Sequence, residues 1–457
     1  MPRFISHRLQ PPRDRLLSEV KREVKASRSQ SLHNAVLSNL CQEAAPPGVS
    51  RCWDVEVKMS HRPSFRLPPK ASVAKVFDRI GGKLVILGAT GAGKTTTLLE
   101  LALVLVSRAE KDPSLPVPVL FELGTWKAES GAIADWLITQ LNFKYGISPA
   151  VGKQWLATQK ILPLLDGLDE VETHRQNFCI QAINLFIGGE FKPKNLVVCS
   201  SFEVYKNCQT RFKLQAAVLL KPLTETQIHN YLLAARSREL WYSIEQDYEL
   251  VKMAKAPLFL SMMALAYEEI LIESWKRLNS GEEQRKYLLT AYIRRQMTGA
   301  FRLHLRGKEL RSEQIRHWLG WLARRMEQQG TQELLLDKMS YRWLETGEQQ
   351  RVYHFGVKLV GGLIWVILGS IATLVTGSIW GLIAGAIAAV ISALLPGIPA
   401  IENMILHLVL WSNGYIPWNY SGFLDAAADR LLLQKTGDRR YRFIHDLLQK
   451  HFAEISH

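Results

Sequence analysis

The sequence predicts an α/β fold in which a parallel sheet is followed by helical and mixed regions. Three observations carry this prediction. Short, continuous runs rich in β-branched residues alternate with amphipathic stretches from about residue 83 onward, which is typical of strands buried on both faces of a sheet. A glycine-rich motif joins the first run to a helix. Further along, 43 consecutive residues carry no charged side chain, which predicts a pair of apolar helices inserted into the mixed region.

Composition and charge exclude several classes of protein. The 457 residues are 47% hydrophobic and carry a formal net charge of +15, which excludes a disordered or collagen-like chain. Five cysteines without a C-x-x-C pair disfavour a disulfide scaffold or a cysteine-based zinc site. The first ten residues, MPRFISHRLQ, contain no apolar core, so no cleaved secretory signal is expected.

The N-terminal part is expected to be a basic helical segment over 1–43 and a linker over 44–74. Residues 1–80 hold 15 basic and 7 acidic residues, a net charge of +8. Such a face attracts anionic lipid or nucleic acid, although a solvated helix face explains the charge equally well. Apolar residues recur at helical spacing between 12 and 40. Five prolines within 44–74 break regular structure, which favours a linker.

The glycine-rich motif predicts a phosphate-binding loop. The residues from Gly88 to Thr95 fit G-x-x-x-x-G-K-[ST] between a strand at 83–88 and a helix at 95–108. Backbone N–H groups of such a loop wrap phosphates at a helix N-terminus. Lys94 is expected to reach the β- and γ-phosphates, and the Thr95 hydroxyl to hold Mg²⁺. The predicted binding set is Gly88, Gly91, Ala92, Gly93, Lys94, Thr95 and Thr96.

A second motif, DGLDE, supplies the acids that phosphoryl transfer needs. Asp166 ends the apolar run 161–166, where a carboxylate is needed to hold Mg²⁺. Asp169 and Glu170 are candidates to orient or deprotonate the attacking water, and with Lys94 they form the predicted catalytic set. The sequence therefore predicts a nucleoside triphosphatase that binds ATP or ADP with Mg²⁺ and hydrolyses ATP. No motif decides between adenine and guanine.

These motifs and their order resemble those of the NACHT group of signal-transducing NTPases, in the STAND class, and above all a type common in cyanobacteria. The matching stretches are GATGAGKTTTLLELA, VPVLFELGTW, LPLLDGLDEV, LVVCSSFEVY, LKPLTETQIHNYL, APLFLSMM and YRFIHDLLQKHFA. The resemblance favours ATP. It implies a P-loop NTPase domain over 75–222, a helical domain over 223–310, and a winged-helix domain over 311–354 and 412–457. The last two would close over the nucleotide as a switch.

The resemblance also implies roles for two residues outside the loop. Pro257 would pack near the adenine, and His445 would touch the β-phosphate when ADP holds the protein closed. From the residues alone, Pro257 fits equally an N1 helix proline, and His445 a helix-start histidine with a backbone partner. One departure concerns Ser201, because the family usually has a γ-phosphate-sensing Arg there. Hydrolysis is therefore expected to be slow, unless Arg211 or another cation substitutes.

The charge-free block 359–401 predicts a transmembrane hairpin. One helical span needs about 20 apolar residues, so this block is long enough for two spans joined by a turn at 376–378. Small residues recur every fourth position in both halves, which allows close helix packing or self-association. We expect a hairpin over 355–411 inserted in the winged-helix domain, with the NTPase domain cytoplasmic. A buried hairpin in a soluble domain is the alternative.

The expected function is a membrane-associated, ATP-binding switch whose slow hydrolysis controls conformation and oligomerisation in signalling, including stress or antiphage defence. The expected partners are the nucleotide, the lipid bilayer, further copies of the chain on activation, and an unidentified signalling partner. No clear nucleic-acid motif is found. Two alternatives stay open: a continuously hydrolysing membrane motor, and a membrane-anchored scaffold with a structural nucleotide.

Overall fold

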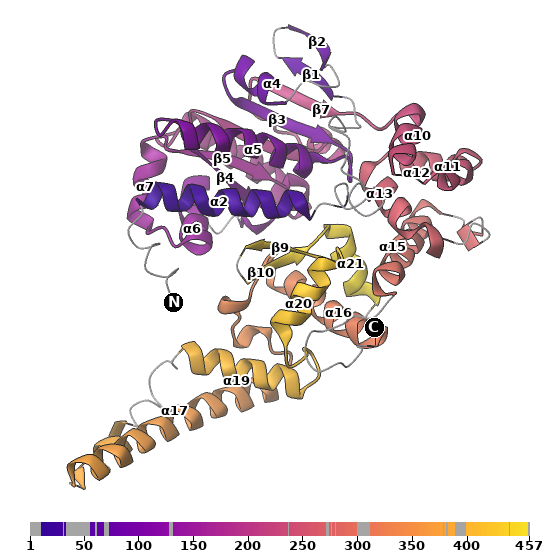
Figure 1. Cartoon of the computed structure of the whole chain (residues 1–457). Coiled ribbons are helices and arrows are strands. Elements are labelled where there is room, and N and C mark those ends of the chain that lie inside the picture. Colours follow the sequence, from indigo (N-terminus) through magenta and orange to yellow (C-terminus); the bar gives the residue numbers. More distant parts are fainter. Residues whose placement is uncertain are drawn as a thin grey trace.

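The computed structural model describes residues 11–30, 32, 55–59, 62–67, 73–127, 131–235, 237–270, 274–275, 277–278, 280–298, 311–377, 379–380, 383–388, 399–437 and 439–455. A sheet region, a helical region and a smaller mixed region are followed in space by a projecting pair of helices (Figure 1). The predicted α/β class with a parallel sheet is confirmed.

The main sheet has seven strands in the order β2-β1-β7-β3-β6-β5-β4, and all neighbours among β3 to β7 pair in parallel. The strands are β1 (Val55–Met59), β2 (Arg62–Leu67), β3 (Lys83–Gly88), β4 (Val117–Glu122), β5 (Ile161–Asp166), β6 (Leu196–Ser201) and β7 (Ala216–Leu220). The four apolar runs coincide with β3, β4, β5 and β6. Their residues are almost all buried, as expected for strands covered on both faces.

The linker prediction for 44–74 is wrong within 55–67. Strand β1 pairs antiparallel with both β7 and β2, so this segment extends the sheet at the edge next to β7. The prolines misled the prediction because Pro63 lies in β2, the outermost strand. An edge strand has one side without ladder hydrogen bonds, so a residue that lacks an N–H is tolerated there.

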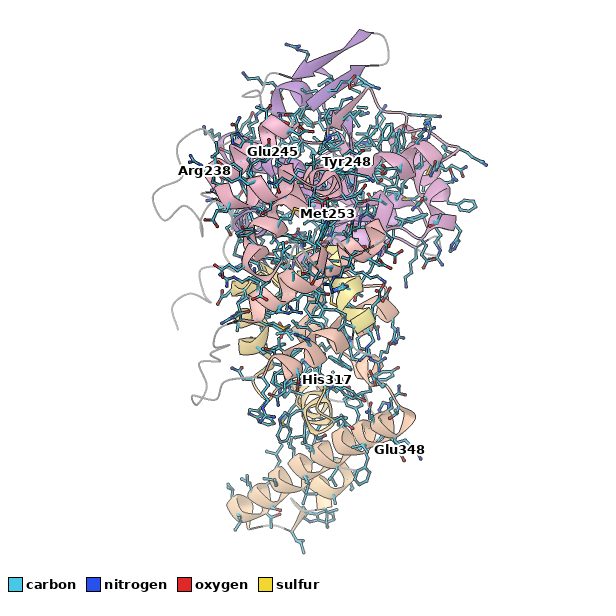
Figure 2. All side chains as sticks on the ribbon, turned by 90° about the vertical axis from the view of Figure 1, so that its right-hand side faces the viewer. Arg238, Glu245, Tyr248, Met253, His317 and Glu348 are labelled. Carbon is cyan, nitrogen blue, oxygen red and sulfur yellow. The ribbon has the colours of Figure 1, made fainter. Side chains whose placement is uncertain are left out.

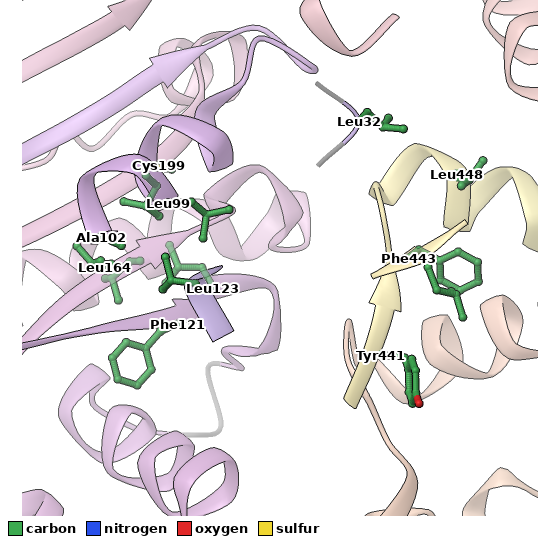
Figure 3. Close-up of a cluster of buried hydrophobic side chains, with 14 of the residues drawn as sticks. Leu32, Leu99, Ala102, Phe121, Leu123, Leu164, Cys199, Tyr441, Phe443 and Leu448 are labelled. Atoms are coloured by element: carbon green, nitrogen blue, oxygen red, sulfur yellow. The ribbon is translucent and has the colours of Figure 1, made fainter. Parts of the chain in front are cut away.

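Helices flank the sheet, and the core lies between them and the strands. They are α2 (Pro12–Ser29), α4 (Val73–Arg79), α5 (Lys94–Lys111), α6 (Ile133–Tyr145), α7 (Pro149–Ala157), α8 (Gln176–Gly188) and α9 (Phe202–Asn207), with short 3₁₀ turns η1 (Leu123–Thr125), η3 (Leu168–Glu170) and η4 (Thr173–Arg175). Helix α5 packs across β3 to β6, where Leu99 and Ala102 face Leu164 and Cys199 (Figure 3). Helix α2 lies on α5 and β4, so the N-terminal helix is part of the packed body.

A helical region follows β7. It comprises α10 (Glu225–Ala234), α11 (Arg238–Glu245), α12 (Tyr248–Ala254), α13 (Pro257–Ala266), η5 (Tyr267–Glu269) and α15 (Gly281–Met297). Figure 2 shows α11 and α12 turned toward the viewer, with the labelled side chains of Arg238, Glu245, Tyr248 and Met253. Helix α13 is almost entirely buried, because it packs between α12 and α15.

The smaller mixed region is a three-stranded sheet with three helices. Its elements are α16 (Ser312–Gln329), β8 (Leu334–Leu335), η6 (Leu336–Lys338), η7 (Tyr341–Trp343), α20 (Tyr420–Asp429), β9 (Leu433–Gly437), β10 (Arg440–Phe443) and α21 (Asp446–Ile455). Strand β8 precedes the apolar block, yet it pairs with β10, which follows the block. The apolar block is therefore an excursion that leaves and re-enters one small region. We refer to the described residues of 311–346 and 413–455 below as the winged-helix-like region, after the domain that the sequence analysis predicts there.

The excursion contains α17 (Gly347–Thr376) and α19 (Pro399–Ser412), which pack together and project from the body (Figure 1). Among the described residues, α17 alone is a single unbroken helix long and apolar enough to span a membrane, and 6% of its most apolar 18-residue window is buried. It ends at Thr376 and is followed by Gly377, whose φ of +66° lies in the left-handed region. The sequence predicts a turn at 376–378, and residue 378 of that turn lies outside the described residues. Most of the second predicted span, 381–382 and 389–398, lies outside the described residues.

Glycines allow the two arms of the excursion to approach closely. A Cβ at Gly385 would lie 2.8 Å from the Gly369 Cα and 2.8 Å from the Trp365 carbonyl oxygen. A Cβ at Gly356 would lie 3.1 Å from a methyl group of Ile405 on α19. The small residues at 369 and 385 therefore pack two helices of one chain against each other, one of the two roles that the sequence allows.

Candidate functional site

The candidate site is a cavity of about 390 Å³ that eight separate segments of the chain line. This volume lies within the range of small-molecule sites, about 300–1,000 Å³. The lining includes most of the predicted residues: Gly91, Gly93, Lys94, Thr95, Thr96, Asp166, Asp169, Glu170, Pro257 and His445. Other lining residues come from α2, α13 and the winged-helix-like region, so the cavity lies where these parts meet the sheet.

The phosphate-binding loop has the backbone that its glycines require. Gly91 and Gly93 have φ angles of +77° and +87°, a conformation that L side chains rarely adopt. The predicted residues Gly88 and Ala92 do not line the cavity. A Cβ at Gly88 would lie 3.1 Å from the Cβ atoms of both Ala92 and Leu220, so Gly88 fits the loop against the sheet.

Lys94 and Asp169 face each other across the cavity. The Lys94 Nζ lies 3.5 Å from Asp169 Oδ2 and 3.3 Å from the carbonyl oxygens of Gly88 and Ala89. The backbone N–H of Ser201 donates to Asp169 Oδ1 at 2.9 Å. Position 201 therefore contributes its backbone, while its hydroxyl hydrogen-bonds Glu203.

Thr95 and Asp166, the two residues predicted to hold Mg²⁺, lie in contact with each other. The Thr95 hydroxyl hydrogen-bonds the Asp166 carboxylate, which joins the start of α5 to the end of β5. Burial raises the pKa of Asp166, and the hydrogen bond from Thr95 partly opposes this shift. Mg²⁺ prefers one or two carboxylates together with phosphates and waters, and a hydroxyl with one carboxylate fits that preference. No cluster of three metal-ligating side chains occurs in the described parts of the chain.

Glu170 is held by the winged-helix-like region. The Gln332 side-chain amide donates to Glu170 Oε2, so the winged-helix-like region meets the sheet region at a candidate catalytic acid. Glu170 is exposed at the cavity, yet desolvation by the surrounding protein, together with the nearby charges of Asp166 and Asp446, raises its pKa above the ordinary value. A carboxylate in such surroundings is a stronger base when ionised.

Pro257 begins α13 as its first residue, and it also lines the cavity, so the two interpretations of this proline are compatible. The next residue anchors the helix to the loop, because the Leu258 N–H donates to the Gly91 carbonyl at 3.1 Å. A Cβ at Gly91 would lie 2.9 Å from the Leu258 Cβ. The helical region therefore rests directly on the phosphate-binding loop.

His445 combines a helix-start position with a place at the cavity. Its Nδ1 accepts a hydrogen bond from the Leu447 N–H at 3.1 Å, just before α21. Burial lowers the pKa of His445 to about 4. The imidazole is therefore neutral at pH 7, and because Nδ1 accepts, the proton resides on Nε2. A phosphate oxygen can accept a hydrogen bond from this neutral Nε2–H group.

Arg442 also lines the cavity, although the sequence analysis did not single it out. It lies on β10, where Tyr441 and Phe443 are buried on the opposite face by the two-residue alternation of a strand. That alternation is the signal that could have identified it. Arg211, the substitute considered above, does not line the cavity; its guanidinium bonds the carbonyls of Tyr205, Lys206 and Cys208 near the end of α9.

A buried cluster of charges lies beside Arg442, where three parts of the chain meet. Lys144 on α6 lies 3.6 Å from Glu122 on β4 and 3.5 Å from Glu333 of the winged-helix-like region. Glu23 of α2 accepts a 2.6 Å hydrogen bond from Tyr145 and is electrostatically coupled to Lys144. The cluster thus joins the N-terminal helix, the sheet edge and the winged-helix-like region.

No family model matches the chain, and no curated protein matches it by sequence. Solved structures match it over most of its length, and two of them are as follows. Cdc6p from Pyrobaculum aerophilum shares 11% identity over 87% of this chain and 96% of its own, with a TM-score of 0.27. The Orc1 protein of Aeropyrum pernix in complex with DNA shares 13% identity over 84% and 90%, with a TM-score of 0.31.

The comparison with the DNA-bound structure corrects one prediction. The sequence analysis found no clear nucleic-acid motif, and that prediction is wrong, because a structure that aligns with most of this chain is a complex with DNA. DNA binding is a property of that protein. With a TM-score of 0.31 the comparison assigns no DNA-binding role to this chain, and the site described above rests on its own geometry.

Proposed function

We propose that the chain is a nucleotide-dependent switch of the NACHT type that binds ATP or ADP with Mg²⁺ and hydrolyses ATP slowly. One observation carries this proposal. The phosphate-binding loop, the two acidic positions after β5, Pro257 and His445 line one cavity together with Arg442 of β10. A nucleotide in this cavity contacts the sheet, the helical region and the winged-helix-like region at once, so its identity can bias how they dock.

The side chains divide the work of binding and hydrolysis. The backbone of the loop and Lys94 hold the phosphates, while Thr95 and Asp166 hold Mg²⁺, which neutralises charge on the phosphates when it is bound. Glu170 is the better candidate to orient or deprotonate water, because both Asp169 oxygens already have partners. Gln332 restrains Glu170 while the winged-helix-like region is docked, which agrees with slow turnover.

The first test identifies the nucleotide that copurifies with detergent-solubilised protein and measures turnover under saturating Mg-ATP, with Lys94→Ala as the control. Retained ADP and turnover near background support the switch. Empty sites with sustained turnover that Lys94→Ala abolishes favour a continuously hydrolysing motor. A retained nucleotide that neither exchanges nor turns over favours a scaffold with a structural nucleotide.

We further propose that the excursion formed by α17 and α19 is a membrane hairpin. Residues 359–376 are free of charge and helical, and at 1.5 Å per residue they extend about 27 Å, close to the thickness of a hydrocarbon core. Large apolar side chains on this helix are exposed; examples are Leu363, Ile367, Ile371 and Leu374, the last at 84%. A core helix of a soluble domain would bury such side chains.

Flotation with liposomes tests the hairpin. The double variant Leu363→Asp and Ile367→Asp alters two exposed positions and leaves the contact at Gly369 intact. We expect wild-type protein to float and the variant to remain in the soluble fraction with unchanged nucleotide binding. Wild-type protein that is monodisperse without detergent and does not float would contradict the membrane proposal.

A further inference from the structure

Arg442 has partners on two different parts of the chain. Its Nε donates to the Gln434 side chain at 2.7 Å, within the winged-helix-like region. Its Nη1 lies 3.3 Å from Glu122 Oε1, at the end of β4. Its Nη2 has no partner among the residues that the structure describes. Arg442 thus joins the winged-helix-like region to the sheet and has an unused donor at the cavity.

The position of Glu122 makes this ion pair sensitive to the nucleotide. Glu122 is the register partner of Asp166 on the neighbouring strand, so the Arg442–Glu122 pair lies beside the predicted Mg²⁺ site. Both Glu122 and Arg442 line the cavity. Burial acts to lower the pKa of Arg442, but the carboxylates of Glu122, Glu333 and Asp166 together raise it, so the guanidinium remains charged.

The other cations at the cavity are less suited to read an additional phosphate. Lys94 belongs to the loop, where it serves any nucleotide with a β-phosphate. Lys450 is exposed and pairs with Asp446 at 2.9 Å. Among the lining cations that the structure describes, Arg442 alone combines three features: partial burial, a planar fork of donors, and a position in the winged-helix-like region, which the proposed switch would move.

We propose that Arg442 senses the terminal phosphate: a bound nucleoside triphosphate takes the Arg442 guanidinium from Glu122, whereas a diphosphate leaves the ion pair intact. The inference rests on the proposed function, because it requires a nucleotide in this cavity. It assigns to β10 the positive charge that Ser201 cannot supply.

The exchange gives a physical route from the nucleotide to the docking of the winged-helix-like region. When Arg442 turns to the phosphate, one of the ion pairs between that region and the sheet is lost. Glu122 keeps Lys144 as its partner at 3.6 Å, so its carboxylate is not left without a counter-charge. A diphosphate offers no competing oxygen at this point, and the docked arrangement persists.

The test compares binding of a non-hydrolysable ATP analogue and of ADP to four full-length proteins. Arg442→Gln removes the sensing charge, and Glu122→Gln removes its competitor. Arg440→Gln is the matched control, because Arg440 lies on the same face of β10, bonds the Lys144 carbonyl and does not line the cavity. The fourth protein is the wild type.

We expect opposite shifts in the two variants. Arg442→Gln weakens binding of the ATP analogue at least about tenfold and binding of ADP much less, because charge-assisted hydrogen bonds to the terminal phosphate are lost. Glu122→Gln shifts the preference toward the ATP analogue, and Arg440→Gln leaves the ratio of the two affinities near that of the wild type.

If the ion pair had a purely structural role, Arg442→Gln and Glu122→Gln would change the ratio of the two affinities in the same direction, or Arg442→Gln and Arg440→Gln would change it equally. Either result would overturn the inference. If Arg442→Gln does not fold, the Glu122→Gln shift decides alone. A wild-type protein that binds neither nucleotide overturns the proposed function as well, whereas binding with an unchanged ratio overturns the inference only.

Discussion

Replacement of Lys144 by Met is predicted to destabilise the docked arrangement strongly. The Lys144 side chain is 4% exposed, and its ammonium lies 3.6 Å from Glu122 and 3.5 Å from Glu333. Burial would lower the pKa of Lys144, but Glu122, Glu333 and Glu23 raise it instead, so the lysine is charged at every pH of interest. Met has a similar length and removes the charge alone.

The expected loss follows from the carboxylates that remain. Removing one partner of a buried pair costs about 3–5 kcal/mol, because the other charge is left uncompensated. This is a large fraction of a typical unfolding free energy of about 5–15 kcal/mol. Urea unfolding followed by circular dichroism measures the loss. Lys153→Met on α7 is the control, since Lys153 is exposed and the effect there is expected to stay within about 0.5 kcal/mol.

The pH dependence supplies the sign that identifies the cause. Without Lys144, the pKa values of the remaining carboxylates rise, so the folded variant is penalised most above them and recovers as acid protonates these groups. In the wild type, burial acts to raise the pKa of Glu333, but Lys144 and Thr436 hold it below its ordinary value, so stability from this group is lost as pH falls. The difference between the two proteins must therefore shrink from pH 7 toward pH 5. A loss under 1 kcal/mol, or one independent of pH, would refute this reasoning.

Three further predictions concern the nucleotide site and the hairpin. Lys94→Ala should weaken nucleotide binding by at least about tenfold in equilibrium titrations, because a charged contact to the phosphates is lost; unchanged binding would remove the phosphate-loop assignment. His445→Gln should leave the pH dependence of ADP affinity between pH 8 and pH 5 unchanged, since His445 is neutral throughout with a pKa of about 4; a step near pH 6.5 that His445→Gln abolishes would contradict this. Gly385→Val should disrupt the contact with Gly369 and lower thermal stability in detergent, whereas Gly361→Val, with no neighbour within 4 Å of its Cβ, should not; equal effects would argue against close helix packing.

The sequence predicted the parallel part of the main sheet and the glycine-rich loop well because their signals are local. Each of the four apolar runs is short enough to be a strand, and the phosphate-binding loop needs glycines at fixed positions with positive φ. Thr95 lies at the start of a helix that follows one strand, and Asp166 lies at the end of another strand of the same parallel sheet. These two positions leave the side chains little freedom in where they meet.

The interfaces between regions were not predictable in the same way. Arg442, Gln332 and Glu122 reach the site from segments far apart in sequence. Nothing local distinguishes Gln332 and Glu122 from surface residues, and the strand alternation at Arg442 shows only which face it lies on, not that this face meets the cavity. Strands β1 and β2 were missed for a related reason. Strand β1 joins the sheet by pairing with β7, which lies about 160 residues later in the chain, and prolines obscured the strand pattern of β2. The N-terminal helix was expected to expose a basic face, yet Arg13 and Lys21 bond groups near the end of α5.

The central claim is that the nucleotide in the cavity sets the docking of the winged-helix-like region. Hydrogen–deuterium exchange of the amides in β10 and α21, with ADP and with a non-hydrolysable ATP analogue, tests it most directly. We expect these amides to be strongly protected from exchange with ADP and to lose protection with the analogue and Mg²⁺. Lys94→Ala is expected to abolish this difference. Equal protection with both nucleotides, or the same difference in Lys94→Ala, would contradict it.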